Sequence, residues 1–446
     1  MDTIAAIATA HGIGSISIVR VSGDRAYDIA TKLSKKETIK PRLATLSFLY
    51  DFHDNPIDEA IIIYFKSPHS FTGEDVVEFQ CHGGVAVANL ILNETIRLGA
   101  RLANPGEFSK RAFLNGKIDL TKAEAIAKII ETKSLDAIKI LSKQIKGELK
   151  RFVDEIRDEL VEILSHAEVN IDYAEEDLPS DLEEAIKNRV KSIAEKMEQT
   201  LKISRKKEGL INGFSICIVG KPNVGKSSLL NAILDSNRAI ISDIAGTTRD
   251  TIEEEMKIGT HLVKVIDTAG MREAKDQIEK IGIEKTIQSI EKSDIVIALF
   301  DGSRETDRED EDILRLLDGY KDKKKIFTFI NKADLPLKFD TEKLSSFAPK
   351  KISAKNGAEE VVEALREYLD IQSVDDEIVL TSKRQMDELK ESVAALKRSI
   401  EPLEDGELEL FAYEINDAIS HISSITKAFE RDEILDKMFG SFCLGK

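Results

Sequence analysis

The chain has 446 residues, 42% of them hydrophobic and 33% charged, a composition typical of a soluble protein with roughly two to four domains. The formal net charge of −17 argues against a general nucleic-acid binder, because affinity for phosphates comes mainly from Lys and Arg. No apolar run approaches the roughly 18 residues of a membrane span, and Asp2 stands where a secretory signal carries a basic residue. The three cysteines, Cys81, Cys217 and Cys443, are too far apart for a zinc motif or a disulfide framework. We therefore expect a cytoplasmic protein with no membrane association.

The first part of the chain has two patterns. Over residues 1–118, short β-branched runs at 15–21 and 60–65 predict strands separated by turns. Beyond Leu120, apolar residues recur every three or four positions, which predicts one long helix with an apolar face formed by Ile138, Leu141, Ile145, Leu149, Phe152, Ile156, Leu160 and Ile163. We expect this helix to end near Asp172, and a second helix to cover about 182–201.

Between residues 214 and about 369, strands alternate with helical stretches. Near-continuous apolar runs at 214–219, 261–266, 295–300 and 326–330 predict an α/β domain with a mostly parallel sheet. After Ser382 a helical stripe returns, formed by Met386, Leu389, Val393, Leu396 and Ile400. Helical segments on both sides of an α/β segment predict a helical domain interrupted by an insertion, which is tolerated when the insertion's ends lie close together.

A phosphate loop opens the α/β segment. The string Gly220-Lys-Pro-Asn-Val-Gly-Lys-Ser227 follows a predicted strand, opens an apolar helix and fits the pattern GxxxxGK[ST]. In such a loop, backbone N–H groups surround the phosphates at a helix N-terminus. We expect Lys226 to contact the β- and γ-phosphates and Ser227 to offer its hydroxyl to Mg²⁺.

Further motifs follow in the order that a GTP site requires. Thr248 offers a second hydroxyl to Mg²⁺, and Asp267-Thr-Ala-Gly270 can hold a Mg²⁺-bound water and sense the γ-phosphate. In Asn331-Lys-Ala-Asp334, the aspartate can accept hydrogen bonds from N1–H and N2–H₂ of guanine, an edge that adenine does not present. Ser353-Ala-Lys355 is expected to back the guanine O6. These motifs predict a GTPase.

The group that positions the attacking water is not evident from spacing. Many GTPases carry a glutamine directly after the DxxG glycine, but here that residue is Met271, whose thioether cannot orient water. Carboxylates that could replace it follow at Glu273, Asp276, Glu279 and Glu284. Spacing alone does not choose among them.

Longer strings outside the nucleotide motifs carry a resemblance. They are Phe71-Thr-Gly-Glu-Asp75, Cys81-His-Gly-Gly84, Pro105-Gly-Glu-Phe108, Arg111-Ala-Phe-Leu-Asn115, Asp243-Ile-Ala-Gly-Thr-Thr-Arg-Asp250 and Cys443-Leu-Gly-Lys446. Over nearly its whole length the chain resembles the tRNA modification GTPases called MnmE or TrmE. The resemblance implies a P-loop GTPase domain inserted into a helical domain and preceded by an α+β folate-binding-like domain. The implied parts are a folate-binding and dimerisation domain at 1–118, helical parts at 119–210 and 375–446, and a G domain at 211–374.

The resemblance also implies partners and cofactors. It implies a homodimer joined through the N-terminal domains, whose G domains pair when nucleotide and K⁺ are bound. An FAD-dependent protein of the MnmG or GidA type is the implied partner in adding an aminomethyl or carboxymethylaminomethyl group to carbon 5 of the wobble uridine of tRNA. A tetrahydrofolate derivative, of the 5-formyl or 5,10-methylene type, is the implied one-carbon donor.

Individual residues take roles from the same resemblance. K⁺ is expected on Asn223, Ser242, Ile244 and Thr247, Mg²⁺ on Ser227 and Thr248, and folate on Arg20, Glu78, Lys117 and Lys446. Glu279 matches the catalytic glutamate of the family. The expected GTP contacts are Asn223, Val224, Gly225, Lys226, Ser227, Ser228, Ser242, Thr247, Thr248, Asp267, Thr268, Ala269, Gly270, Asn331, Lys332, Asp334, Ser353, Ala354 and Lys355. Cys443 is either a nucleophile or a tolerated cysteine close to the terminus.

Two other classes of GTPase are alternatives. A ribosome-assembly GTPase, acting as an RNA-binding switch, should carry a basic appendage, which this acidic chain lacks. A membrane-remodelling GTPase should have a basic amphipathic surface, whereas the helix faces here mix Lys with Glu. A GTPase acting in tRNA modification therefore fits the sequence best.

Overall fold

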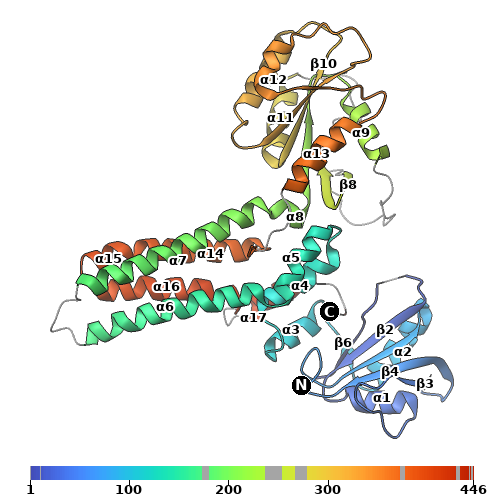
Figure 1. Ribbon diagram of the computed structural model, residues 1–446. Coiled ribbons are helices and arrows are strands. Elements are labelled where there is room, and N and C mark those ends of the chain that lie inside the picture. The colour runs from blue at the N-terminus through green and yellow to red at the C-terminus, as the bar shows by residue number, and fades with distance from the viewer. Residues whose placement is uncertain are drawn as a thin grey trace. The chain divides into compact units, whose positions relative to one another are not determined.

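A computed structural model of the chain describes residues 2–10, 12–172, 180–236, 254–266, 279–371, 377–427, 432–440, 442 and 445. The chain divides into two compact units, both drawn in Figure 1. The first unit contains Met1–Ile130, Gln144–Met197 and Ser382–Lys446, and the second contains Glu131–Lys143 and Glu198–Thr381. In the described part of the chain, no helix is both long and apolar enough to cross a membrane.

The first unit begins with a six-stranded sheet. Its strands are β1 (Ile4–Ile7), β2 (Ile16–Ser22), β3 (Thr45–Tyr50), β4 (Pro56–Phe65), β5 (Val76–His82) and β6 (Arg101–Leu102). They lie in the order β3-β4-β5-β2-β1-β6, and all neighbours are antiparallel except β1 and β6. The strands predicted at 15–21 and 60–65 are confirmed as β2 and part of β4.

One face of this sheet is buried and the other carries polar side chains. Helices α1 (Ala26–Ser34) and α2 (Val85–Arg97) share a core with alternate strand residues such as Val19, Val77 and Phe79. Because successive side chains of a strand point to opposite faces, the residues between them face away from these helices. Arg20 of β2 and Glu78 of β5 pair in register on that second face.

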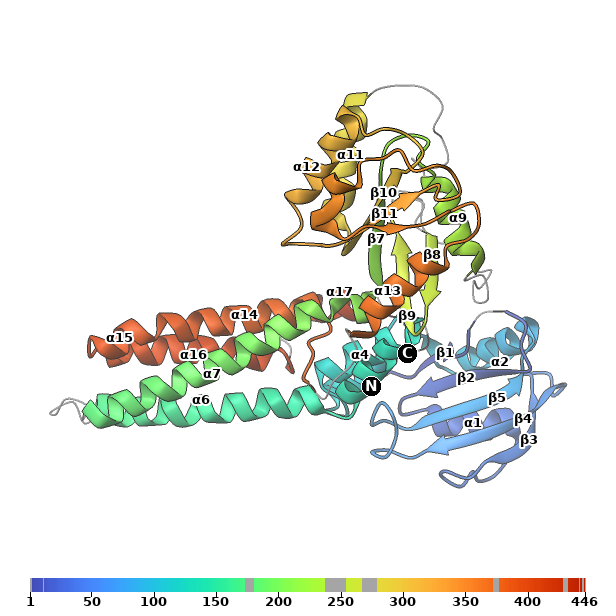
Figure 2. The ribbon, with the colours of Figure 1, turned by 45° about the horizontal axis from the view of Figure 1, so that its top comes forward.

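The rest of the first unit is helical. It contains α3 (Glu107–Leu114), α4 (Leu120–Glu131), α6 (Glu148–Asp172), α14 (Lys383–Arg398), α15 (Ile400–Glu404), α16 (Leu408–Ser424), α17 (Asp432–Phe439) and most of α7 (Ser180–Lys206). Figures 1 and 2 show α6, α7, α14 and α16 side by side as a bundle. Because α6 packs along α16, segments on either side of the α/β insertion form one helical body, as predicted.

The prediction of a single helix over 138–163 is wrong. The chain forms two helices there, α5 (Leu135–Ile145) and α6, with a turn at Gly147 between them. Gly147 has φ +84°, a left-handed conformation that favours glycine, and its N–H donates to the carbonyl of Gln144. The spacing from Ile145 to Leu149 still fits a helical period, so the apolar pattern passes through the break unchanged.

The second unit contains the α/β segment. Its sheet has the order β12-β11-β10-β7-β9-β8, and only the pair β8 and β9 is antiparallel. The strands are β7 (Phe214–Val219), β8 (Glu254–Ile258), β9 (His261–Val265), β10 (Ile295–Asp301), β11 (Lys325–Asn331) and β12 (Lys350–Lys351). All four predicted strands are confirmed, and the parallel sheet is the one expected for this segment.

Helices cover both faces of this sheet. On one face, α9 (Lys226–Ser236) and α13 (Glu359–Ile371) pack against residues such as Ile216 and Ile297. On the other face, α11 (Glu279–Lys292) and α12 (Arg308–Asp318) pack against Cys217 and Val296. Cys217 is therefore a buried core residue, as expected. A short α8 (Glu208–Asn212) and a 3₁₀ helix, η2 (Thr341–Phe347), complete the unit.

Candidate functional site

The phosphate loop lies between β7 and α9. Strand β7 lies between β9 and β10, so the strands that follow β7 in the chain are placed first on one side of it and then on the other. Ligands of parallel α/β sheets bind at the carboxyl ends of the strands at such a switch in strand order. Gly225 has φ +102°, and a Cβ there would lie 2.2 Å from Nδ2 of Asn331. Only glycine fits this position, because both the backbone conformation and the close neighbour exclude a side chain.

Lys226 points into the loop. Its Nζ donates to the carbonyl oxygens of Gly220, at 2.6 Å, and Lys221, at 2.8 Å. Burial lowers the pKa of Lys226. The ammonium is thus held at the N-terminus of α9, where the helix dipole and free N–H groups already favour an anion.

Asn331 connects three of the predicted motifs. It is buried at the end of β11, and its Nδ2 donates to the carbonyl of Val224 at 2.7 Å. Its Oδ1 accepts from the N–H of Ala354 at 2.8 Å. One side chain therefore ties the phosphate loop, the base-selecting motif and the loop 353–355 together.

The carboxylate expected to select the base, Asp334, is exposed and has a lowered pKa. Ser353 Oγ donates to Asp334 Oδ1 at 2.8 Å, and this hydrogen bond is the main reason that the pKa of Asp334 lies below its ordinary value. Asp334 is exposed, so its other lone pairs can accept hydrogen bonds from a base. Lys355, which follows Ala354 in the sequence, is exposed.

A second carboxylate supports this motif and was not singled out from the sequence. Asp301, buried at the end of β10, lies 2.6 Å from Nζ of Lys332 and accepts from Ser303 Oγ at 2.7 Å. Burial alone would raise the pKa of Asp301, but the hydrogen bond from Lys332 lowers it. An acid directly after the apolar run 295–300 was the available signal.

Several expected site residues lie outside the described residues. They are Ser242, Ile244, Thr247, Thr248, Asp267, Thr268, Ala269, Gly270, Cys443 and Lys446. Glu279 begins α11, but its side chain is outside the description. Ser227 and Ser228 lie exposed in the first turn of α9.

Two of the expected folate residues lie together in the first unit. Arg20 Nε donates to Glu78 Oε1 at 2.9 Å. The Nη1 of Arg20 donates to the carbonyl of Gly445 at 3.3 Å, next to Lys446 in the sequence. Phe108 and Phe71 flank the guanidinium, with ring centroids 5.7 and 6.0 Å from its carbon. Gly445 therefore lies at the polar face of the N-terminal sheet.

The third described folate candidate lies at a polar cavity. A cavity of about 390 Å³ is lined by Asp24, Ser67, Pro68, Gly73, Glu74, Asp75, Asn115 and Lys117. Of the described residues, Arg20 and Glu78 are not part of this lining. The structure thus pairs Arg20 with Glu78, and places Lys117 at a polar cavity whose lining includes three acidic residues, Asp24, Glu74 and Asp75.

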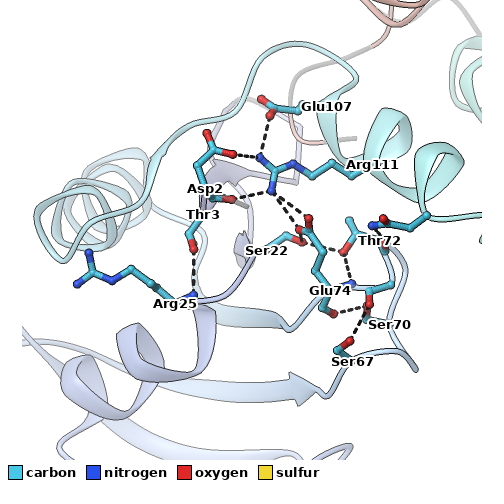
Figure 3. Close-up of polar contacts among 12 residues, drawn as sticks. Asp2, Thr3, Ser22, Arg25, Ser67, Ser70, Thr72, Glu74, Glu107 and Arg111 are labelled. Carbon is cyan, nitrogen blue, oxygen red and sulfur yellow. Dashed lines mark hydrogen bonds and ion pairs between the residues drawn. The ribbon is translucent and has the colours of Figure 1, made fainter. Parts of the chain in front are cut away.

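A buried arginine, Arg111, contacts Glu74, one of the residues that line this cavity, and Figure 3 shows this contact. The Arg111 side chain is 8% exposed, and its guanidinium lies 3.1 Å from Glu74, 2.7 Å from Asp2 and 3.0 Å from Glu107. Ser22 Oγ also donates to Glu74 at 2.8 Å. Burial alone would raise the pKa of Glu107, but its contacts with arginines hold it below the usual value. The cluster joins the N-terminal segment, β2, the loop before β5 and α3.

We expect Arg111→Met to lower the free energy of unfolding by about 3–5 kcal/mol, because it leaves the nearly buried Glu74 without its cation and removes one of the two arginines that pair with Glu107. Urea denaturation followed by circular dichroism measures this change. Arg101→Met is the matched control: Arg101 also contacts Asp2 and Glu107 but is 45% exposed, so its loss should cost about 1 kcal/mol or less. Equal costs for the two variants would contradict the prediction.

The parallel sheet, the phosphate loop after β7 and the base-selecting motif after β11 define a P-loop GTPase. The chain also matches two described protein families: the GTP-binding protein TrmE N-terminus at residues 3–117, and the MnmE helical domain at residues 120–443. The chain belongs to the MnmE family of tRNA modification GTPases and is a GTP hydrolase.

Curated relatives are similar over their full length. The tRNA modification GTPase MnmE of Aliarcobacter butzleri is 59% identical over 445 residues, covering 100% of this chain and 99% of the relative. The protein of the same description from Sulfurimonas denitrificans is 56% identical with the same coverage. Among solved structures, the G domain of the T. maritima FeoB iron transporter is 25% identical, covering 35% of this chain and 98% of that one, with a TM-score of 0.25. A TM-score this low carries no argument about the fold.

Proposed function

We propose that this chain is a K⁺-dependent GTPase that acts with an FAD-dependent protein of the MnmG or GidA type. Together they carry out 5-(carboxymethyl)aminomethyl modification of the wobble uridine of tRNA, in the cytoplasm. The chain works as a homodimer, with a folate domain at 1–118, helical parts at 119–210 and 375–446, and a G domain at 211–374. The observation that carries the proposal is the match of the chain to the TrmE N-terminus at residues 3–117 and to the MnmE helical domain at residues 120–443.

Analysis of tRNA nucleosides from cells that lack the protein tests this function. We expect the modified wobble uridine to be lost. Normal wobble nucleosides together with accumulated ribosomal subunits would instead support a ribosome-assembly GTPase.

Each side chain of the nucleotide site has one role in binding or hydrolysis. Lys226 neutralises charge on the β- and γ-phosphates, and Asp334 selects guanine. Ser227 follows Lys226 in the first turn of α9, and its hydroxyl is the kind of oxygen ligand that suits Mg²⁺. With Thr248, Ser227 would hold that ion, which supplies positive charge to the phosphate oxygens when bound. Glu279, at the start of α11, orients the attacking water.

A bound K⁺ supplies the charge that an arginine supplies in other GTPases. Asn223 is exposed within the phosphate loop and has φ +66°, a conformation that asparagine tolerates better than most residues. Its side-chain oxygen, with main-chain or side-chain oxygens of Ser242, Ile244 and Thr247, would surround the ion. Charge that develops between the β- and γ-phosphates in the transition state is thereby stabilised.

We expect GTP hydrolysis to be about tenfold faster or more in K⁺ than in Na⁺ at equal ionic strength, because the smaller Na⁺ does not reach all of the ligands. Phosphate release assays in the two salts measure the difference. In Asn223→Ala, the same assays should give similar, slow rates in both salts. Equal rates for the unaltered protein would remove K⁺ from the proposal.

The folate site lies on the polar face of the N-terminal sheet. Glu78 is already oriented by Arg20, which leaves its remaining lone pairs for N–H groups of a pterin ring. The folate glutamate carries carboxylates, and in this acidic chain Lys117 and Lys446 supply cations to meet them. Gly445, which precedes Lys446 in the sequence, contacts Arg20.

Deletion of residues 443–446 should abolish tRNA modification and weaken folate binding by about tenfold or more, because it removes a charged ligand and the Gly445 acceptor. GTP turnover should stay within a few-fold of the unaltered protein. Isothermal titration with a reduced folate, run beside a GTPase assay on the same preparation, measures both. Retained folate affinity with collapsed GTP turnover would place the tail at the nucleotide instead.

A further inference from the structure

A second lysine of the phosphate loop is buried among carboxylates. The Lys221 side chain is 5% exposed, and its Nζ lies 2.5 Å from Asp307 Oδ2 and 2.8 Å from Asp310 Oδ2. The loop pattern GxxxxGK[ST] leaves this position free, so the pattern does not explain a lysine there. A buried ammonium is costly unless it is paired, and both of these contacts join the loop to the start of α12.

The two carboxylates are fixed by the helix that carries them. Asp307 is the N-cap of α12, and its Oδ1 accepts from the N–H groups of Glu309 and Asp310. Asp310 Oδ2 accepts in turn from the N–H of Asp307 at 3.1 Å, which completes a capping box. Both acceptors are therefore positioned independently of Lys221, and they form a rigid anchor for its ammonium.

The backbone of the same residue holds the phosphate-binding lysine. The carbonyl oxygen of Lys221 accepts from Lys226 Nζ at 2.8 Å. Because Pro222 follows, Lys221 is also restricted toward extended backbone conformations. With the side chain anchored at one end and proline at the other, the direction of this carbonyl is fixed.

We propose that Lys221 is a positioning residue for GTP: anchored by Asp307 and Asp310, it fixes the carbonyl that places the ammonium of Lys226. The inference rests on the proposed contact of Lys226 with the β- and γ-phosphates. It deepens that site by adding α12 to the groups that set nucleotide affinity.

A simpler explanation is electrostatic: Lys221 could act only by offsetting two negative charges near the phosphates. The two explanations predict opposite changes in nucleotide affinity when a carboxylate of the anchor is neutralised. Lys221→Met removes a positive charge and Asp310→Asn removes a negative one, so a pure field effect would weaken nucleotide binding in the first variant and strengthen it in the second. Loss of positioning weakens binding in both.

We expect each of these variants to raise the Kd for GDP and GTP by about tenfold, since small displacements of a phosphate-binding group are costly. The double variant should bind nucleotide no more weakly than the single variant with the higher Kd, because both changes break the same anchor. Lys221→Arg should restore most of the affinity. Glu311→Gln is the matched control: it removes one negative charge from the same helix, in an exposed pair with Lys343, and should change Kd by less than about twofold.

Fluorescent nucleotide titrations provide the readout, at temperatures where circular dichroism shows each variant folded. If Asp310→Asn does not fold, Asp307→Asn replaces it, since that side chain is 55% exposed and its loss is better tolerated. Lys226→Ala tests the nucleotide site itself, separately from the positioning role of Lys221. Unchanged affinity in Lys226→Ala would overturn the proposed nucleotide site itself. Lost affinity there, with unchanged or oppositely shifted affinities for Lys221→Met and Asp310→Asn, would overturn only the positioning role.

Discussion

Asp334→Asn should raise the Kd for GTP by about 10³-fold or more and give the protein affinity for xanthosine triphosphate. A site built around hydrogen bonds to one base rejects a base that leaves those groups unpaired. In the unaltered chain both carboxylate oxygens of Asp334 are acceptors, suited to N1–H and N2–H₂ of guanine. The asparagine amide presents a donor in place of one acceptor, which opposes the guanine amino group and suits the 2-oxo group of xanthine.

Competition titrations with GTP, XTP and ATP measure the exchange of specificity. Ser353→Ala is the control, because it removes the 2.8 Å hydrogen bond to Asp334 but leaves both acceptors in place. It should weaken GTP by about tenfold at most, the usual worth of one hydrogen bond, without creating affinity for XTP. Unchanged preference for GTP in Asp334→Asn would exclude Asp334 as the residue that reads the base.

The parts of the G domain that the sequence predicts are local in character. Four of the six strands described in its sheet are recognisable because buried parallel strands are continuous apolar runs. The phosphate loop was recognisable because Gly225 and Lys226 stand at fixed spacing between a strand and a helix. Strand β8 (Glu254–Ile258) escaped prediction because its residues are mostly polar, and its place in the sheet comes from pairing with β9.

The contacts that position the site residues join segments far apart in the chain. Arg20 and Gly445 are separated by 425 residues, and Lys221 and Asp310 by 89. Neither the hydrophobic periodicity nor a sequence motif predicts such a contact, because each partner on its own is an ordinary charged or small residue. The resemblance to a family named Arg20, but the anchoring of Lys221 by α12 follows only from the fold.

Glu279→Ala should lower kcat by about 10²–10⁴-fold, the usual contribution of a group that orients or deprotonates a nucleophile, and leave the Kd for GTP nearly unchanged. The expectation starts from Met271, which stands where other GTPases carry the water-positioning glutamine and cannot replace it. Among the carboxylates downstream, Glu279 is the first residue of α11, and a helix N-terminus stabilises a negative charge.

Single-turnover hydrolysis and nucleotide titration on the same preparation separate chemistry from binding. Glu284→Ala is the matched control, because it removes a carboxylate from the same helix one turn further along and should leave kcat within about threefold. Glu279→Gln then distinguishes two roles: an amide can still orient water but cannot take its proton. Activity retained in Gln and lost in Ala would indicate orientation, and equal losses would indicate proton transfer. Full turnover in Glu279→Ala, or a loss explained wholly by weaker GTP binding, would exclude Glu279 from catalysis and return the choice to the other carboxylates.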